Sequence, residues 1–318
     1  ETVMAAAGIS MREAFGQALV ELAGNCPEMM VLDADVSASS RTVLFGKQYP
    51  DRFFNVGVAE ANMIDIAAGM ATCGLRPVVN TFALFITLKG ADQVRNIVCY
   101  NNLPVVFAGT YAGLSDSFDG ASHQSVLDVA IMRAMPNVTV VVPADNVEVR
   151  QALQAALRRD GPTYIRICRN PTPVLFEDAA PLEIGRIRKL RDGADLTIAV
   201  CGVPTYMAIE AAERLAAAGI SADLIEVSTV KPIDEAALLQ SVRKTGKILT
   251  VEEHTVVGGL GGAVAEILGK RAPVRMDFIG VPDCFAESGP YIELLRKFGI
   301  STDEIESRAR QLVEGVAA

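Results

Sequence analysis

Apolar runs of membrane length are missing from the sequence, and so are clusters of basic residues. The longest apolar candidate, residues 196–203, is only as long as a strand, whereas a membrane-spanning helix needs roughly 20 apolar residues. Lysine and arginine are scattered, and the formal net charge is −9, which is unsuited to binding a phosphate backbone. We therefore expect a soluble protein that binds neither a membrane nor a nucleic acid.

Paired cysteines are also missing, since no CxxC pair occurs and no secretory apolar segment precedes the first cysteine. Widely separated cysteines of this kind are typical of buried, reduced residues in a cytoplasmic protein. We expect neither disulfides nor a metal site of this chain's own from the six cysteines, which are Cys26, Cys73, Cys99, Cys168, Cys201 and Cys284.

Several common catalytic motifs are absent. The sequence has no GxGxxG after a strand, no Walker loop, no GxSxG elbow and no HExxH. A dinucleotide oxidoreductase, a P-loop kinase and a serine hydrolase are therefore disfavoured.

The chain does contain a regular alternation of short β-branched runs and Ala-rich segments with helical period from residue 53 onward. This alternation predicts an α/β fold of mostly parallel sheets with helices on both faces. The expected strands are residues 77–82, 105–108, 138–142, 164–168, 196–201, 223–227, 247–251 and 274–279. The expected helices are residues 62–72, 84–100, 124–135, 147–159, 206–218, 235–244 and 260–270.

One Pro-rich and charged stretch, residues 170–195, interrupts the alternation, as a connection between domains would. At 318 residues the chain is long enough for two domains with separate cores. We expect an N-terminal domain at residues 1–178, a linker at 179–194 and a C-terminal domain at 195–318.

The chain has only two histidines, and both lie in Gly-containing segments between a strand and a helix. His123 is expected at the carboxyl end of a strand, where ligands collect in parallel sheets, or as a ring that satisfies a loop carbonyl. His254 precedes a glycine-rich helix start, which suits either an anion at the helix N-terminus or close backbone packing.

Glu60 is a third candidate, because it follows a strand and begins an apolar helix. Its carboxylate is expected near the positive end of the helix dipole, either as a functional group or as an ordinary first-turn glutamate. Phe82 and Phe85 flank the next junction between strand and helix, where they could stack on a flat ligand or fill the core.

Together these segments resemble the transketolase family. The matching motifs of its pyrimidine-binding domain are NVGVAEANMIDIAAGMA (55–71), TFALF (81–85), DQVRN (92–96), DGASHQ (119–124) and PNVTVVVPAD (136–145). The segment VEEHTVVGGLGGAVAEIL (251–268) resembles the family's C-terminal domain. The order and spacing of the motifs fit over nearly the whole chain.

The resemblance implies thiamine diphosphate as the cofactor, and it implies that the N-terminal domain of the family is supplied by another chain. In this family an N-terminal domain marked by a GDG sequence holds the diphosphate through Mg²⁺ or another divalent cation, and no GDG occurs here. The chain therefore resembles the C-terminal subunit of a split transketolase. An N-terminal partner subunit with the GDG motif is implied, in an assembly expected to be a heterotetramer.

Roles for residues around the cofactor follow from the resemblance. The residue matching Glu60 bonds the aminopyrimidine ring and is catalytic, and a nonpolar site favours the neutral carboxyl that this role needs. The residue matching Phe85 stacks on that ring, Phe82 lines the same pocket, and Asp35 lies near the cofactor.

Roles at the substrate follow in the same way. Asp119 and the catalytic residue His123 match contacts to substrate hydroxyls, whereas Arg12, Ser39 and Arg169 match residues that bind a sugar phosphate. Tyr111 stands where the family usually has a second substrate histidine, and Phe118 stands where a glutamate is common. These two departures predict a less basic donor pocket.

The resemblance implies transfer of a two-carbon ketol unit from a ketose phosphate to an aldose acceptor. Two related alternatives are the beta subunit of a 2-oxoacid dehydrogenase, whose family lacks the DGASHQ loop, and a deoxyxylulose-phosphate synthase, which is a single long chain. A non-catalytic regulatory subunit is a third alternative, although Glu60, Phe85 and His123 are all present.

Overall fold

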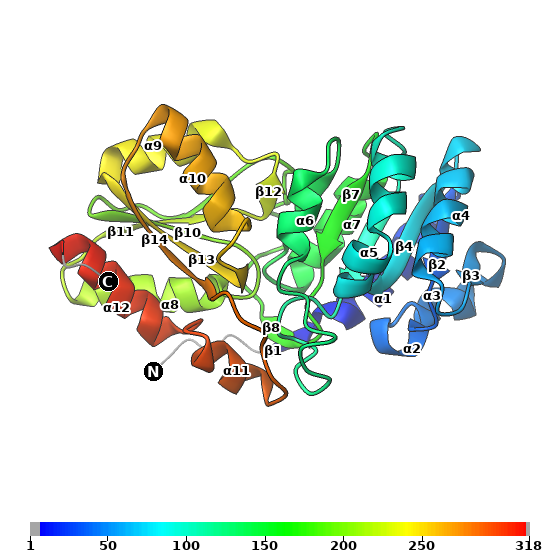
Figure 1. The fold of residues 1–318 in the computed structure, drawn as a ribbon, viewed down its shortest axis with the longest axis horizontal. Helices are drawn as coiled ribbons and strands as arrows, with labels where there is room; N and C mark the ends of the chain where they lie inside the picture. The colour runs from blue at the N-terminus through cyan, green and yellow to red at the C-terminus, as the bar shows by residue number, and fades with distance from the viewer. Residues whose placement is uncertain (1–6, 316–318) are drawn as a thin grey trace.

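The computed structural model describes residues 7–315 and contains two large, mostly parallel sheets flanked by helices (Figure 1), which confirms the expected fold class. The first sheet has the order β12-β6-β7-β5-β4-β2-β3, with every pair parallel except β12 with β6. Its strands are β2 (Met29–Asp33), β3 (Phe53–Asn55), β4 (Arg76–Phe82), β5 (Val106–Thr110), β6 (Thr139–Val141), β7 (Thr163–Arg166) and β12 (Thr229–Lys231).

Helices cover both faces of this sheet because its central strands are apolar on both sides. Val78 of β4 packs into the core under α1 (Met11–Ala23), α3 (Val43–Gln48) and α7 (Asn146–Leu157). The next residue, Val79, packs into the opposite core under α4 (Glu60–Thr72), α5 (Ala83–Lys89) and α6 (Asp128–Ala134). Successive side chains of a strand point to opposite faces, so a continuous apolar run needs a cover on each.

The second sheet has the order β14-β13-β10-β11-β9. Its strands are β9 (Arg188–Arg191), β10 (Leu196–Val200), β11 (Ala222–Glu226), β13 (Lys247–Thr255) and β14 (Arg275–Val281), and β9 alone of these pairs antiparallel. Figure 1 shows α9 (Glu235–Thr245) and α10 (Leu260–Arg271) on one face and α8 (Thr205–Ala217) with α12 (Thr302–Glu314) on the other.

Several segments join the two halves. β12 follows β11 in the sequence but pairs with β6 of the first sheet. β9 lies inside the expected linker but pairs with β11 of the second sheet. One apolar cluster continues from α4, α5 and α6 to α9 and α10. A further short sheet pairs β1 (Ala7–Ser10) with β8 (Pro171–Pro173), while α11 (Tyr291–Lys297) follows β14.

Two expected helices differ in extent. The helix expected at 84–100 is divided into α5 and a π-helix (Gln93–Cys99), and the one expected at 124–135 begins only at Asp128. Gly90 marks the division, since a Cβ there would lie 2.3 Å from Ile64 Cδ1 of α4. The chain turns at this close approach instead of continuing as one helix.

The cysteine expectation is partly wrong. All six cysteines are free, but Cys73 and Cys284 are exposed, whereas the other four are buried. Cys73 ends α4 on the solvent side and Cys284 lies in the loop after β14. Among residues 7–315, no helix is long and apolar enough to cross a membrane.

Candidate active site

Most of the residues singled out in the sequence gather where strands of the first sheet end. Phe82 is the last residue of β4, Tyr111 follows β5, and Arg169 lies shortly after β7. Glu60 begins α4, which follows β3. Carboxyl ends of parallel strands meet at one edge of a sheet, so side chains far apart in sequence come together there.

Four aromatic rings form the centre of this group. Phe82 stacks on Tyr111 with ring centroids 4.5 Å apart and planes at 22°. The His123 ring lies edge-on to Phe85 at 5.3 Å and to Phe82 at 6.2 Å. The DGASHQ loop therefore lies against the Phe82 and Phe85 pair, with the His123 Nδ1 bonded to Ser122 Oγ at 3.0 Å.

Glu60 is nearly buried beside this aromatic group, with 5% of its surface exposed. Its Oε1 accepts a hydrogen bond from Lys89 Nζ at 2.9 Å. The same ammonium lies 4.0 Å from the centroid of the Phe85 ring. Sequence reasoning missed Lys89, although Phe85 and Lys89 are four residues apart, a spacing that places both on one face of a helix.

Two arginines flank Tyr111. Arg12 Nη1 donates to the Tyr111 hydroxyl at 2.5 Å and to the Ser39 carbonyl at 2.8 Å, while the Arg169 guanidinium lies 4.9 Å from the Tyr111 ring centroid. Tyr111 has φ of +57°, a conformation that a bulky residue adopts only when its surroundings hold it there. The tyrosine thus links Arg12, Arg169 and Phe82 into one cluster.

Asp116 is a second residue that sequence reasoning missed. It has no exposed surface, its Oδ1 lies 3.3 Å from Arg169 Nη1, and its Oδ2 has no hydrogen-bond partner among the described residues. Burial, followed by the nearby carboxylate of Asp119, raises the pKa of Asp116 to about 7, although Arg169 opposes the rise. The exposed Asp119 is therefore coupled to Arg169 through Asp116.

Asp35 lies at the edge of the cluster. Its carboxylate accepts a hydrogen bond from Asn55 Nδ2 at 3.0 Å, and its φ is +64°. Asp35 and Asn55 follow or end the neighbouring strands β2 and β3, so the bond ties two strand ends together beside α4. Phe118 is 67% exposed, which leaves the position before Asp119 open to solvent.

His254 lies outside this cluster and holds the two halves together. Its Nδ1 faces the Thr255 carbonyl at 2.8 Å and its Nε2 accepts from the Ala130 N–H at 3.3 Å, an arrangement that suits a neutral ring with the proton on Nδ1. The start of α10 already holds an anion, since the N–H groups of Leu260 and Gly261 donate to the Glu252 carboxylate. The glycines there allow close packing.

Arg166 also lies between the two sheet-containing halves of the chain. It is buried, its Nε lies 2.9 Å from Asp128 Oδ2, and its Nη2 donates to the Glu253 carbonyl at 2.8 Å. The Glu253 carboxylate accepts from Leu114 N–H and the Tyr291 hydroxyl, and burial raises its pKa to about 7.

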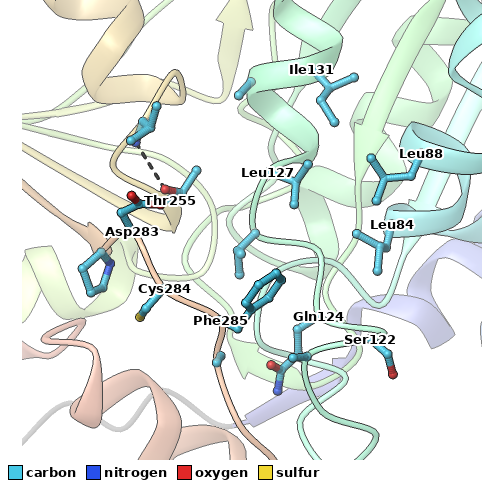
Figure 2. Close-up of a pocket in the computed structure, with 16 residues that line it drawn as sticks. Leu84, Leu88, Ser122, Gln124, Leu127, Ile131, Thr255, Asp283, Cys284 and Phe285 are labelled. Carbon is cyan, nitrogen blue, oxygen red and sulfur yellow. Dashed lines mark hydrogen bonds between the residues drawn. The ribbon is translucent and has the colours of Figure 1, made fainter.

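An apolar pocket of about 830 Å³ adjoins the cluster between α5, α6 and the loop after β14. Figure 2 shows Leu84 and Leu88 of α5, Leu127 and Ile131 around α6, and Phe285 from the loop. Phe285 is 90% exposed and Leu88 is 53% exposed. The pocket lining contains none of the predicted site residues, and within residues 7–315 no three His, Cys, Asp or Glu side chains are placed to hold a metal ion.

Comparison with known proteins agrees with this architecture. Residues 7–174 match the family described as "Transketolase, pyrimidine binding domain", and residues 185–305 match "Transketolase, C-terminal domain". A protein of Methanocaldococcus jannaschii named as a transketolase C-terminal section is 40% identical over 94% of each chain. The 6-deoxy-6-sulfo-D-fructose transketolase subunit SqwH of a Clostridium species is 40% identical over 96% of this chain and 94% of its own.

A solved structure is similar throughout. It is described as a split gene transketolase in an inactive β4 tetramer, and it superposes with a TM-score of 0.91 at 42% identity, covering 96% of this chain and 99% of that one. The chain thus belongs to the transketolase family and carries its pyrimidine-binding and C-terminal domains, as the C-terminal sections of split transketolases do.

Proposed function

We propose that this chain supplies the pyrimidine side of a thiamine-diphosphate site and, with an N-terminal partner subunit, transfers a two-carbon ketol unit from a ketose phosphate to an aldose acceptor. The observation that carries the proposal is the nearly buried Glu60 carboxylate at the start of α4, within reach of an ammonium that also lies over Phe85. A carboxyl group beside an aromatic face suits a flat, basic heterocycle.

The residues of the cluster fit the aminopyrimidine end of the cofactor. Glu60 would bond a ring nitrogen, Phe85 would stack on the ring, and Phe82 and Asp35 would border the pocket. Bound thiamine diphosphate supplies the carbanion chemistry, while the protein orients it. The divalent cation and the diphosphate would be held by the N-terminal partner subunit, as the resemblance to split transketolases implies.

The substrate would lie over the Tyr111 side of the cluster. Asp119 and His123 are placed on one loop, where a carboxylate and an imidazole can orient sugar hydroxyls. Arg12, with the Ser39 segment that it contacts, and Arg169 would bind the terminal anion of the sugar. Tyr111 lies between the two guanidinium groups and carries no charge near neutral pH.

Partner binding is proposed at the apolar pocket and its rim. Leu88, Val257 and Phe285 are exposed there, and contiguous apolar surface of this kind is typical of protein interfaces. The pocket adjoins the aromatic cluster through Leu84 and Ser122, so a subunit seated on it would lie next to Glu60 and Phe85.

The experiment combines the purified chain with its N-terminal subunit, thiamine diphosphate and Mg²⁺ and measures ketol transfer. Glu60→Gln should lower kcat by about two to three orders of magnitude, since a group that helps to move a proton contributes on that scale. Glu235→Gln is the matched control, because Glu235 also begins a helix but is exposed.

Each competing function has its own outcome in this assay. Decarboxylation of pyruvate in place of ketol transfer would favour the 2-oxoacid dehydrogenase or deoxyxylulose-phosphate synthase alternative. Absence of thiamine-diphosphate binding in the complex would favour a non-catalytic subunit. Full activity of Glu60→Gln would contradict the role proposed for this carboxyl group.

A further inference from the structure

Lys89 occupies the place that the proposed cofactor ring needs. It is the last residue of α5, its side chain is 47% exposed, and its Nζ lies 2.9 Å from Glu60 Oε1. The same Nζ lies 4.0 Å from the centroid of the Phe85 ring. One ammonium therefore satisfies the Glu60 carboxylate and covers an aromatic face at the same time.

A flat ring stacked on Phe85 would lie about 3.5 to 4 Å above it, in the layer that the Lys89 ammonium now fills. A ring nitrogen bonded to Glu60 would also compete with the Lys89 ammonium for this carboxylate, whose Oε1 already accepts a hydrogen bond from Lys89. The side chain of Glu60 is only 6% exposed, so a ligand and the ammonium cannot both approach it freely. The two arrangements exclude each other.

We propose that Lys89 is a placeholder for the aminopyrimidine ring, pairing with Glu60 and covering Phe85 until the cofactor displaces it. The inference rests on the proposed function of this site. Lys89 is suited to the movement because it stands at a helix end next to Gly90 with a half-exposed side chain, and its ammonium can swing into solvent without disturbing the buried core.

The consequence is a weaker apparent affinity for the cofactor. The fraction of molecules with an open site is reduced by the Lys89 pairing, and the apparent Kd rises by the same factor. A charge-assisted hydrogen bond together with a cation–π contact makes that factor roughly tenfold. Lys89→Met keeps the length of the side chain but removes the ammonium.

The test measures binding of thiamine diphosphate with Mg²⁺ to the complex of this chain and its N-terminal subunit by isothermal titration calorimetry. We expect Lys89→Met to lower the Kd about tenfold, and the control Lys47→Met, at an exposed position on α3, to leave it unchanged. An unchanged or higher Kd for Lys89→Met would overturn the inference, and a higher one would indicate that Lys89 holds the bound cofactor. No binding by any of the proteins would instead contradict the proposed function.

A second measurement needs no cofactor. In the free chain, Lys89→Met and Glu60→Gln should show coupled effects on the thermal unfolding midpoint, because each removes the same pair. Additive effects in the free chain would also overturn the inference.

Discussion

The pH dependence of stability offers a direct test of the electrostatics in the candidate site, through Asp116→Asn. Asp116 is buried with one carboxylate oxygen unpaired, and burial together with Asp119 raises its pKa from 3.8 to about 7. A carboxyl group with a raised pKa binds its proton more tightly in the folded chain than in the unfolded one. Its contribution to stability is therefore fully present below about pH 4 and is lost as the pH rises to about 7.

The size of the loss follows from the pKa values. A rise from 3.8 to about 7 corresponds to at most about 4 kcal/mol of folding free energy above pH 7. The neighbouring Arg169 is one-third exposed, so solvent screens the site, and we expect about 1–2 kcal/mol. Asp116→Asn keeps the shape of the side chain but cannot ionise, so the variant should be the more stable protein at pH 8.

The assay is urea unfolding of both proteins at pH 5 and pH 8. The stability of the variant minus that of the wild type should grow by about 1 kcal/mol between these values. Other buried acids with raised pKa, such as Glu148 and Glu253, are common to both proteins and cancel in the difference. Asp119→Asn, which retains Asp116 but removes its acidic neighbour, should show a weaker pH dependence than the wild type. A difference that stays constant or shrinks with rising pH would contradict the raised pKa of Asp116.

Two further substitutions test other parts of the structure. Arg166→Met leaves the buried Asp128 carboxylate without its ion pair and should lower the free energy of unfolding in urea by about 3–5 kcal/mol. The control Arg133→Met, whose partner Glu266 is largely exposed, should lower it by less than about 1 kcal/mol. Equal losses would contradict the assignment of a buried pair. Tyr111→Phe keeps the ring stacked on Phe82 but loses the hydrogen bond to Arg12. The KM for a phosphorylated donor should therefore rise about fivefold, with kcat nearly unchanged. A fall in kcat alone would contradict a binding role.

The parallel core of the fold was predictable because its strands are short apolar runs that need cover on both faces. β9 and β12 were not, since RKLR is mostly charged and TVK has only three residues. Both are edge strands that pair antiparallel with segments distant in sequence. The region before residue 53 was not assigned either, although α1 buries Met11, Phe15, Ala18 and Leu22 at helical spacing.

The candidate site likewise contains residues that the sequence predicts and residues that it does not. Glu60, Phe82, Phe85 and His123 lie in motifs whose local pattern marks the junction of a strand and a helix, and the fold brings them together. Lys89 and Asp116 have no comparable local signal. Their significance comes from pairs separated by 29 residues for Lys89 with Glu60 and by 53 for Asp116 with Arg169, which exist only once the sheet has formed.

These pairs would change the charge that the two arginines present to the proposed substrate. Arg169 faces a carboxylate at 3.3 Å, whereas the hydrogen bonds of the Arg12 guanidinium go to a hydroxyl and a carbonyl, which are neutral. Arg12 thus keeps its full positive charge, and the charge that Arg169 offers depends on the protonation of Asp116. A terminal anion on the sugar would be held mainly by Arg12 above pH 7 and by both arginines below it. Any pH dependence of KM for a donor with a fixed terminal charge should therefore disappear in Asp116→Asn, and its persistence would assign the dependence to another group.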